Sequence, residues 1–83
     1  MTTRKVREDA IEILRCCADR GLHDSGGWTW TGAIAEDLGY RRGDAAERLA
    51  DEAWWVASRR TFGLDHPAIC LEAAAWLEDG NQP

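Results

Sequence analysis

Apolar residues recur at helical spacing through the first twenty residues. They fall at i, i+4, i+7, i+8, i+11 and i+12, and charged residues occupy most of the positions between them; the apolar residues are Val6, Ala10, Ile13, Leu14, Cys17 and Ala18. This period matches an α-helix and differs from the two-residue alternation of a strand. It predicts an amphipathic helix over about residues 4–20, with Thr3 as its N-cap and Gly21 as its C-terminal glycine. A helix that is apolar on one face needs other elements to cover that face.

Three further helices are expected, over about residues 32–38, 45–58 and 67–79. Thr31 is the expected N-cap of the first of these. Asp44 precedes the next and has a glutamate three positions later, as in a variant capping box. The last opens on a proline, which is favoured at the first helical position. Eighty-three residues, 45% of them hydrophobic, suit one domain. We therefore expect a mainly α, compact bundle of about four helices spanning residues 1–83.

Two connections between the helices carry weaker signals for β-structure. The segment "WTWT" after "DSGG" alternates aromatic and hydroxyl residues, as a short strand at Trp28–Trp30 would. The segment "RRTFGLDH", residues 59–66, is compatible with a minimal two-stranded β-wing.

The composition of the chain argues against a membrane-spanning, secreted or disulfide-rich protein. No apolar run approaches the roughly 18 residues needed to span a bilayer, and "MTTRKVREDA" lacks the apolar stretch of a secretory signal. The odd set Cys16, Cys17 and Cys70 argues against a disulfide framework, so reduced and mostly buried thiols are expected. We expect a cytoplasmic protein without membrane contact. The net charge of −5 opposes non-specific attraction to nucleic acid.

The central segment 31–53, "TGAIAEDLGYRRGDAAERLADEA", resembles a helix-turn-helix. A small residue in the first helix, a glycine turn and spaced apolar residues carry the resemblance, at Ile34, Ala35, Leu38, Gly39, Ala45 and Leu49, with Tyr40 at the usual apolar turn position. The order of elements over residues 5–64 is similar to the winged variety of this family. The resemblance implies a helix-turn-helix core at about residues 31–57 and a regulatory protein that binds nucleic acid, DNA being the expected form.

An arginine strip would then contact the nucleic acid. Its members are Arg41, Arg42, Arg48, Arg59 and Arg60, with Arg42 and Arg48 as candidate base readers and the others as phosphate contacts. A solvated, salt-bridged surface is the alternative interpretation of these arginines. The expected recognition helix departs from the family because it also carries four carboxylates, Asp44, Glu47, Asp51 and Glu52. Between two phosphate backbones these would lower affinity unless they face away.

The pair Trp54–Trp55 supports a second hypothesis. At about 100° per residue, Trp54 lies at the edge of the apolar arc of its helix, whereas Trp55 lies among the charged residues. Trp55 is therefore either covered by the C-terminal helix or available as a contact anchor. With Asp51 and Glu52 beside it, it would bind a protein partner or form a homodimer. Small adaptors and phage or mobile-element inhibitors of host proteins are modules of this kind.

Catalysis and metal binding have little support. His66 and Cys70 are four residues apart, as a zinc pair can be, and Cys16, Cys17 and His23 could complete a site only if the helices converge. No C-x-x-C spacing, nucleophile elbow or phosphate-binding glycine loop is present. We therefore expect no enzyme activity, no catalytic or metal-binding residues, no cofactor and no small-molecule substrate.

Overall fold

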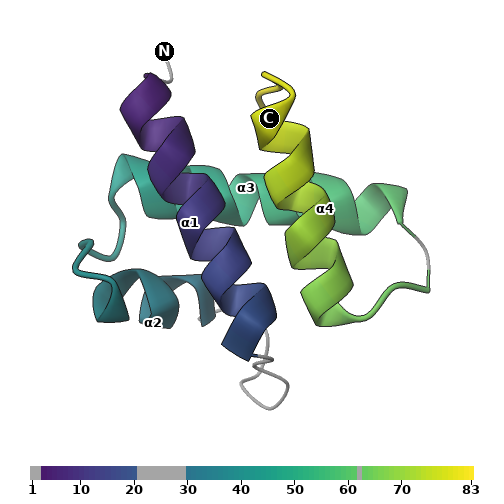
Figure 1. The fold of residues 1–83 in the computed structure, drawn as a ribbon, viewed down its shortest axis with the longest axis horizontal. Coiled ribbons are helices and arrows are strands. Elements are labelled where there is room, and N and C mark those ends of the chain that lie inside the picture. The colour runs from purple at the N-terminus through teal and green to yellow at the C-terminus, as the bar shows by residue number, and fades with distance from the viewer. Residues whose placement is uncertain (1–2, 21–29, 62) are drawn as a thin grey trace.

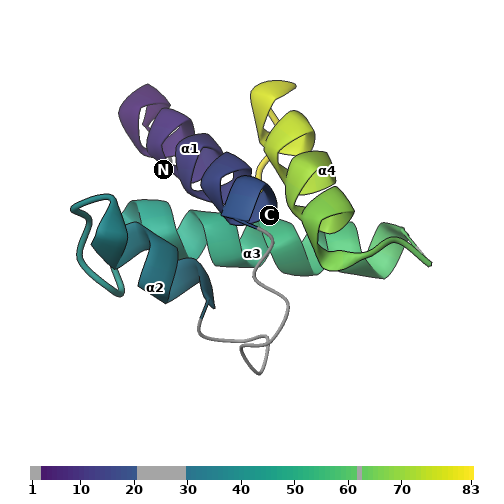
Figure 2. The ribbon, with the colours of Figure 1, turned by 60° about the horizontal axis from the view of Figure 1, so that its bottom comes forward.

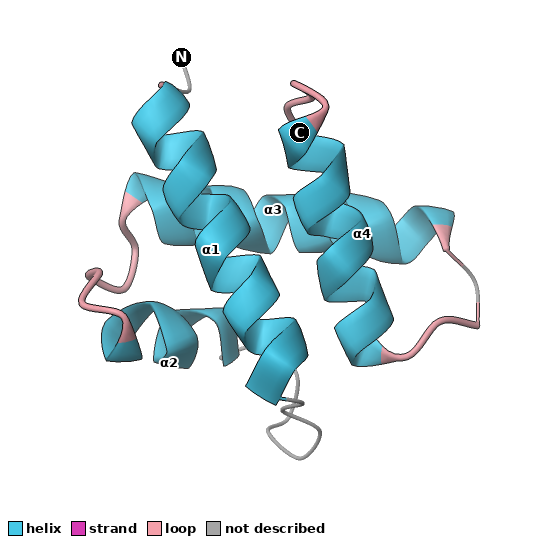
Figure 3. Cartoon of the chain, in the orientation of Figure 1, coloured by secondary structure: helices cyan, strands magenta, loops and turns pink. Residues whose placement is uncertain are grey.

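The structure is a computed structural model that describes residues 3–20, 30–61 and 63–83. Four α-helices make up about three quarters of this part: α1 at Arg4–Arg20, α2 at Trp30–Asp37, α3 at Ala45–Arg60 and α4 at His66–Glu78 (Figure 1). Helices and loops account for all the described residues, and no strand occurs among them (Figure 3). The expectation of a mainly α bundle of about four helices is confirmed.

The helices are arranged in two layers around α3. Helices α1 and α4 lie side by side and run in opposite directions, and both cross the same side of α3 (Figures 1 and 2). Helix α2 lies beside the N-terminal half of α3 and also contacts α1. One long side of α3 therefore remains uncovered by the other described helices.

Alanines on α3 make its close packing against α1 and α4 possible. Ala46, Ala50, Ala53 and Ala57 recur three or four positions apart, and all four are buried. Small side chains let neighbouring helix backbones approach closely, and larger residues fill the space around them. The largest fully buried aliphatic side chains come from α1, α2 and α4, and they are Ile13, Leu14, Ile34 and Leu77.

The helix boundaries agree with the sequence predictions to within two residues, and three of the differences change the interpretation of a segment. Helix α1 has the expected bounds, with the Thr3 hydroxyl accepting a hydrogen bond from the Val6 amide at 3.1 Å. Helix α2 begins at Trp30, so the prediction of Thr31 as its N-cap is wrong. Thr31 lies inside the helix, is only 3% exposed, and hydrogen-bonds to Asp51 on α3. Gly39 closes this segment as expected, with φ +96°.

The other two differences concern the connection before α4. Helix α3 continues to Arg60, and Thr61 with residues 63–65 forms no strand, so the β-wing is not confirmed. Helix α4 begins one residue earlier than expected, and the Asp65 carboxylate caps it by accepting from the Ala68 amide at 3.0 Å. Residues 28 and 29 of the expected strand lie outside the described residues, and Trp30 is helical.

Tyr40 ties the segment between α2 and α3 to α1. Its hydroxyl lies 3.0 Å from a carboxylate oxygen of Asp9 and 2.7 Å from one of Glu12. These hydrogen bonds, together with partial burial, raise the pKa of Tyr40 above its ordinary value. Tyr40 also packs against the hydrophobic core, so it combines the expected apolar turn position with a polar link to α1.

Candidate interaction surface on helix α3

Five of the six exposed residues of α3 lie on one line along the helix, and Arg60 lies off this line. They are Ala45, Arg48, Glu52, Trp55 and Arg59, at alternating spacings of three and four residues, and we call them the outer ridge. At about 100° per residue, Trp55 points almost opposite to the buried alanines of the same helix. The outer ridge therefore faces away from the side of α3 that packs against α1 and α4.

Trp55 is exposed and is supported from behind. Its side chain is 48% exposed, so α4 does not cover it. The ring of Trp54 meets it edge to face, with centroids 5.0 Å apart and an interplanar angle of 87°. Trp54 is half-buried against the core, as expected, and its ring lies 5.6 Å from that of His66. Trp55 is thus a large apolar group on a fixed base, a geometry that favours specific contacts.

Behind Trp55, the ring of Trp54 lies beside His66, which in turn lies next to the thiol of Cys70. Cys70 is fully buried, and its sulfur lies 3.6 Å from His66 Nε2. Burial raises the pKa of the Cys70 thiol to about 12. The thiolate is the nucleophilic and metal-binding form. At neutral pH Cys70 is therefore a packed thiol, and this cluster positions Trp54.

Three of the four carboxylates of α3 are engaged within the molecule. Asp44 is the N-cap residue, and its carboxylate accepts from the Arg41 amide at 3.3 Å without bonding the helix itself. Glu47 accepts from the Gly43 amide at 3.1 Å, one residue before the position that a capping box uses. Asp51 is partly buried beside Thr31. Only Glu52 places its carboxylate on the outer ridge.

Partial burial raises the pKa of Asp51, and the negative charge of Glu47 raises it further. An acid whose pKa is raised by folding destabilises the folded state above that pKa, and the penalty disappears as pH falls through it. We expect Asp51→Asn to raise the free energy of unfolding at pH 7 by roughly 0.5 kcal/mol, since solvent screens this half-exposed site.

The amide oxygen that this substitution introduces can keep the bond to Thr31, so the change isolates the charge. The gain should shrink as pH falls from 7 toward the ordinary aspartate pKa of about 4. Urea unfolding across this pH range, with exposed Glu72→Gln on α4 as the matched control, measures it. A loss of stability at pH 7 would contradict the assignment.

The five arginines of the predicted strip do not form one cluster. Arg41 and Arg42 precede α3, and the Arg42 guanidinium pairs with Glu36 at 2.8 Å and packs over Gly32. Arg48 and Arg59 lie on the outer ridge, about 16 Å apart along the helix axis. Arg60 is exposed beside Arg59 in the last turn. The strip is therefore an extended series along α3 that Glu52 and Trp55 interrupt.

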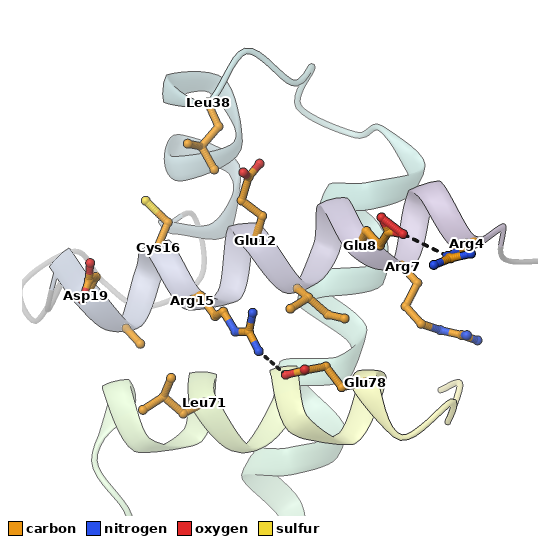
Figure 4. A pocket seen from close by; sticks show the side chains of 12 residues that line it. Arg4, Arg7, Glu8, Glu12, Arg15, Cys16, Asp19, Leu38, Leu71 and Glu78 are labelled. Atoms are coloured by element: carbon orange, nitrogen blue, oxygen red, sulfur yellow. Dashed lines mark hydrogen bonds and ion pairs between the residues drawn. The ribbon is translucent and has the colours of Figure 1, made fainter.

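A broad open groove lies on another face of the molecule, where α1 meets α4 and the end of α2 (Figure 4). Arg15 of α1 reaches across it to form an ion pair with Glu78 of α4, and Arg4 pairs with Glu8 at 3.1 Å. Leu71, 53% exposed, lies at its edge. Its charged groups largely neutralise one another, so the groove offers neither one sign of charge nor a set of converging polar groups to a ligand.

Metal ligands do not gather within the part of the chain that the structure describes: no three His, Cys, Asp or Glu side chains there are placed to share an ion. His23, named in the zinc hypothesis, lies outside the described residues. None of the four helices is long and apolar enough to cross a membrane. Comparison with protein-family models, with curated proteins and with solved structures finds no match to this chain.

Proposed function

We propose that this chain is a small, non-enzymatic interaction module that binds a protein partner through the outer ridge of α3, with Trp55 as the central contact. The observation that carries the proposal is the exposure of Trp55 on a rigid aromatic base. A tryptophan that stays half-exposed in a monomer leaves apolar area in water, and tryptophan is enriched among the residues that dominate binding energy.

The charges around Trp55 suit a protein better than a polyanion. Arg48, Glu52 and Arg59 alternate in sign along the outer ridge, and Asp51 lies beside it. The net charge of the chain is −5. Alternating charges specify partner and register through complementary pairs. An adaptor, or an inhibitor of another protein, would use a surface of this kind.

Trp55→Ala tests the proposed function. Wild-type and variant chains are compared for molar mass at equal concentration and for the proteins that the immobilised chain retains from a cell extract. Leu71→Ala, which removes a similarly exposed apolar residue from α4, is the control. We expect the Trp55 variant to lose either self-association or a retained protein, and we expect the Leu71 variant to keep both. If both the molar mass and the retained proteins are unchanged by Trp55→Ala, the proposal fails.

A second candidate function is binding of nucleic acid by a helix-turn-helix built from α2, the connecting turn and α3. What favours it is the placement of the carboxylates, because Asp44, Glu47 and Asp51 are engaged within the molecule. Arg48 and Arg59 then dominate the charge of the outer ridge. Arg41, Arg42 and Arg60 would extend the contact toward phosphates, whether or not a wing follows α3.

Salt dependence distinguishes the two functions. If α3 binds duplex DNA, a labelled duplex should shift with purified protein at roughly 50 mM salt and lose affinity about tenfold or more by 200 mM. The double variant Arg48→Ala/Arg59→Ala should weaken binding, whereas Arg15→Ala, on the groove between α1 and α4, should not. Absence of any shift at 50 mM salt rules this function out.

A further inference from the structure

We propose that the partner of the outer ridge is a second copy of this chain. Two α3 helices would lie antiparallel across a two-fold axis, with their Trp55 side chains in contact and Glu52 of each copy paired with Arg59 of the other. This inference rests on the proposed function, because it identifies the protein that the same surface binds.

The spacing of the ridge residues allows this pairing. Glu52 and Arg59 are seven residues apart, or about 10.5 Å along the axis, and lie within about 20° of each other around the helix. A two-fold axis between the two helices, level with the midpoint of Glu52 and Arg59, passes beside α3 at the step from Trp55 to Val56. In that register both carboxylates meet arginines, and the two tryptophans lie next to the axis. The contact is isologous, as most protein dimers are.

Charge complementarity selects this register over the other arrangements. A parallel pair would place Arg48, Glu52 and Arg59 opposite the same residues of the second copy, which is repulsive at every step. An antiparallel pair centred two residues earlier would bring Arg48 opposite Arg59. One centred near Ala50 would pair Arg48 with Glu52 but leave Trp55 opposite Ala45, with little apolar surface to cover it. Only the register centred beside Trp55 pairs opposite charges and covers the tryptophan.

No described helix covers the outer ridge where the second copy would bind. The C-terminal half of α3, which carries Trp55 and Arg59, has no other described helix on the side facing away from α1 and α4 (Figures 1 and 2). Val56 flanks the tryptophan and is half-buried, so the apolar area is small. A contact of one tryptophan pair and two exposed ion pairs belongs to the weak class of interfaces. We expect a dissociation constant on the order of 100 µM.

Sedimentation equilibrium of the full chain and of variants with the charges of Glu52 and Arg59 reversed tests the proposal. The mean molar mass should rise from 9.3 kDa toward twice that value between roughly 10 µM and 1 mM. Glu52→Arg and Arg59→Glu should each raise the dissociation constant about tenfold or more, because each places like charges opposite one another. The double variant should restore it to within about threefold. Trp55→Ala should leave a monomer, and Glu72→Arg on α4 should change nothing.

Circular dichroism of each variant checks that the helices remain. If a charge-reversal variant does not fold, the neutral variants Glu52→Gln and Arg59→Gln take its place. A wild-type chain that stays monomeric to 1 mM overturns the homodimer. So does a dimer in which the double variant fails to restore association. If proteins retained from an extract still depend on Trp55 in either case, the proposed function stands and only the identity of the partner changes.

Discussion

Replacing Leu14 by alanine is expected to lower the free energy of unfolding by about 2–5 kcal/mol. Leu14 is fully buried on α1, the helix that packs against both α3 and α4. The cost has two sources, the transfer energy of the lost methyl groups and the cavity that the packed alanines of α3 cannot close. A domain of this size has a total stability of about 4–12 kcal/mol, so the variant should be close to unfolding.

Urea titration followed by circular dichroism measures the effect. Leu71→Ala is the matched control, since it makes the same chemical change on α4 at a residue that is 53% exposed. We expect the control to change stability by less than about 0.5 kcal/mol. Equal losses from the two variants would mean that the core is not where the helices place it.

The second large expected effect is a loss of binding on replacing Trp55, with a different result for the adjacent Trp54. Trp55→Ala should weaken binding through the outer ridge about 30-fold or more, the effect of a residue worth at least 2 kcal/mol at an interface. It should lower the free energy of unfolding by less than about 1 kcal/mol, because the side chain packs on one side only. Trp54→Ala should cost more stability, with a loss of roughly 2 kcal/mol, since Trp54 packs against the core and His66.

Titration of the binding partner against each variant, with chemical unfolding in parallel, gives both quantities. The second copy of the chain serves as the partner if sedimentation shows a dimer. A Trp55 variant that loses stability as strongly as the Trp54 variant would indicate a structural role for the exposed ring.

Helical periodicity predicted most of the fold, and tertiary contacts account for the errors. Thr31 has the local chemistry of an N-cap, yet its hydroxyl bonds Asp51 on α3, and α2 begins one residue before it. Arg59 and Arg60 were expected in a wing but extend α3, where cations at a helix C-terminus are favourable. Neither outcome can be read from residue spacing, because each depends on what lies beside the segment in space.

The sequence predicts the direction in which Trp55 points from α3, but it does not predict whether the side chain is exposed to solvent. Helical geometry fixes Trp55 opposite the buried alanines of α3, so its place on the charged face followed from the sequence. Whether α4 would cover it depended on where α4 crosses α3. In the structure, His66 at the start of α4 packs on Trp54, and Trp55 stays 48% exposed. The engagement of Asp44 and Glu47 with loop amides likewise required the three-dimensional path of the turn.

Photo-crosslinking from position 55 tests the interaction surface most directly. A benzophenone amino acid replaces Trp55 in the full chain inside the expressing cell, and in separate chains it replaces Leu71 or Leu64, the other large exposed apolar residues of the described part. We predict a crosslinked product from position 55, at twice the mass of the chain if the partner is a second copy, and little or none from position 71. Absence of any product at position 55, or equal products at positions 55 and 71, would contradict a binding surface on the outer ridge of α3.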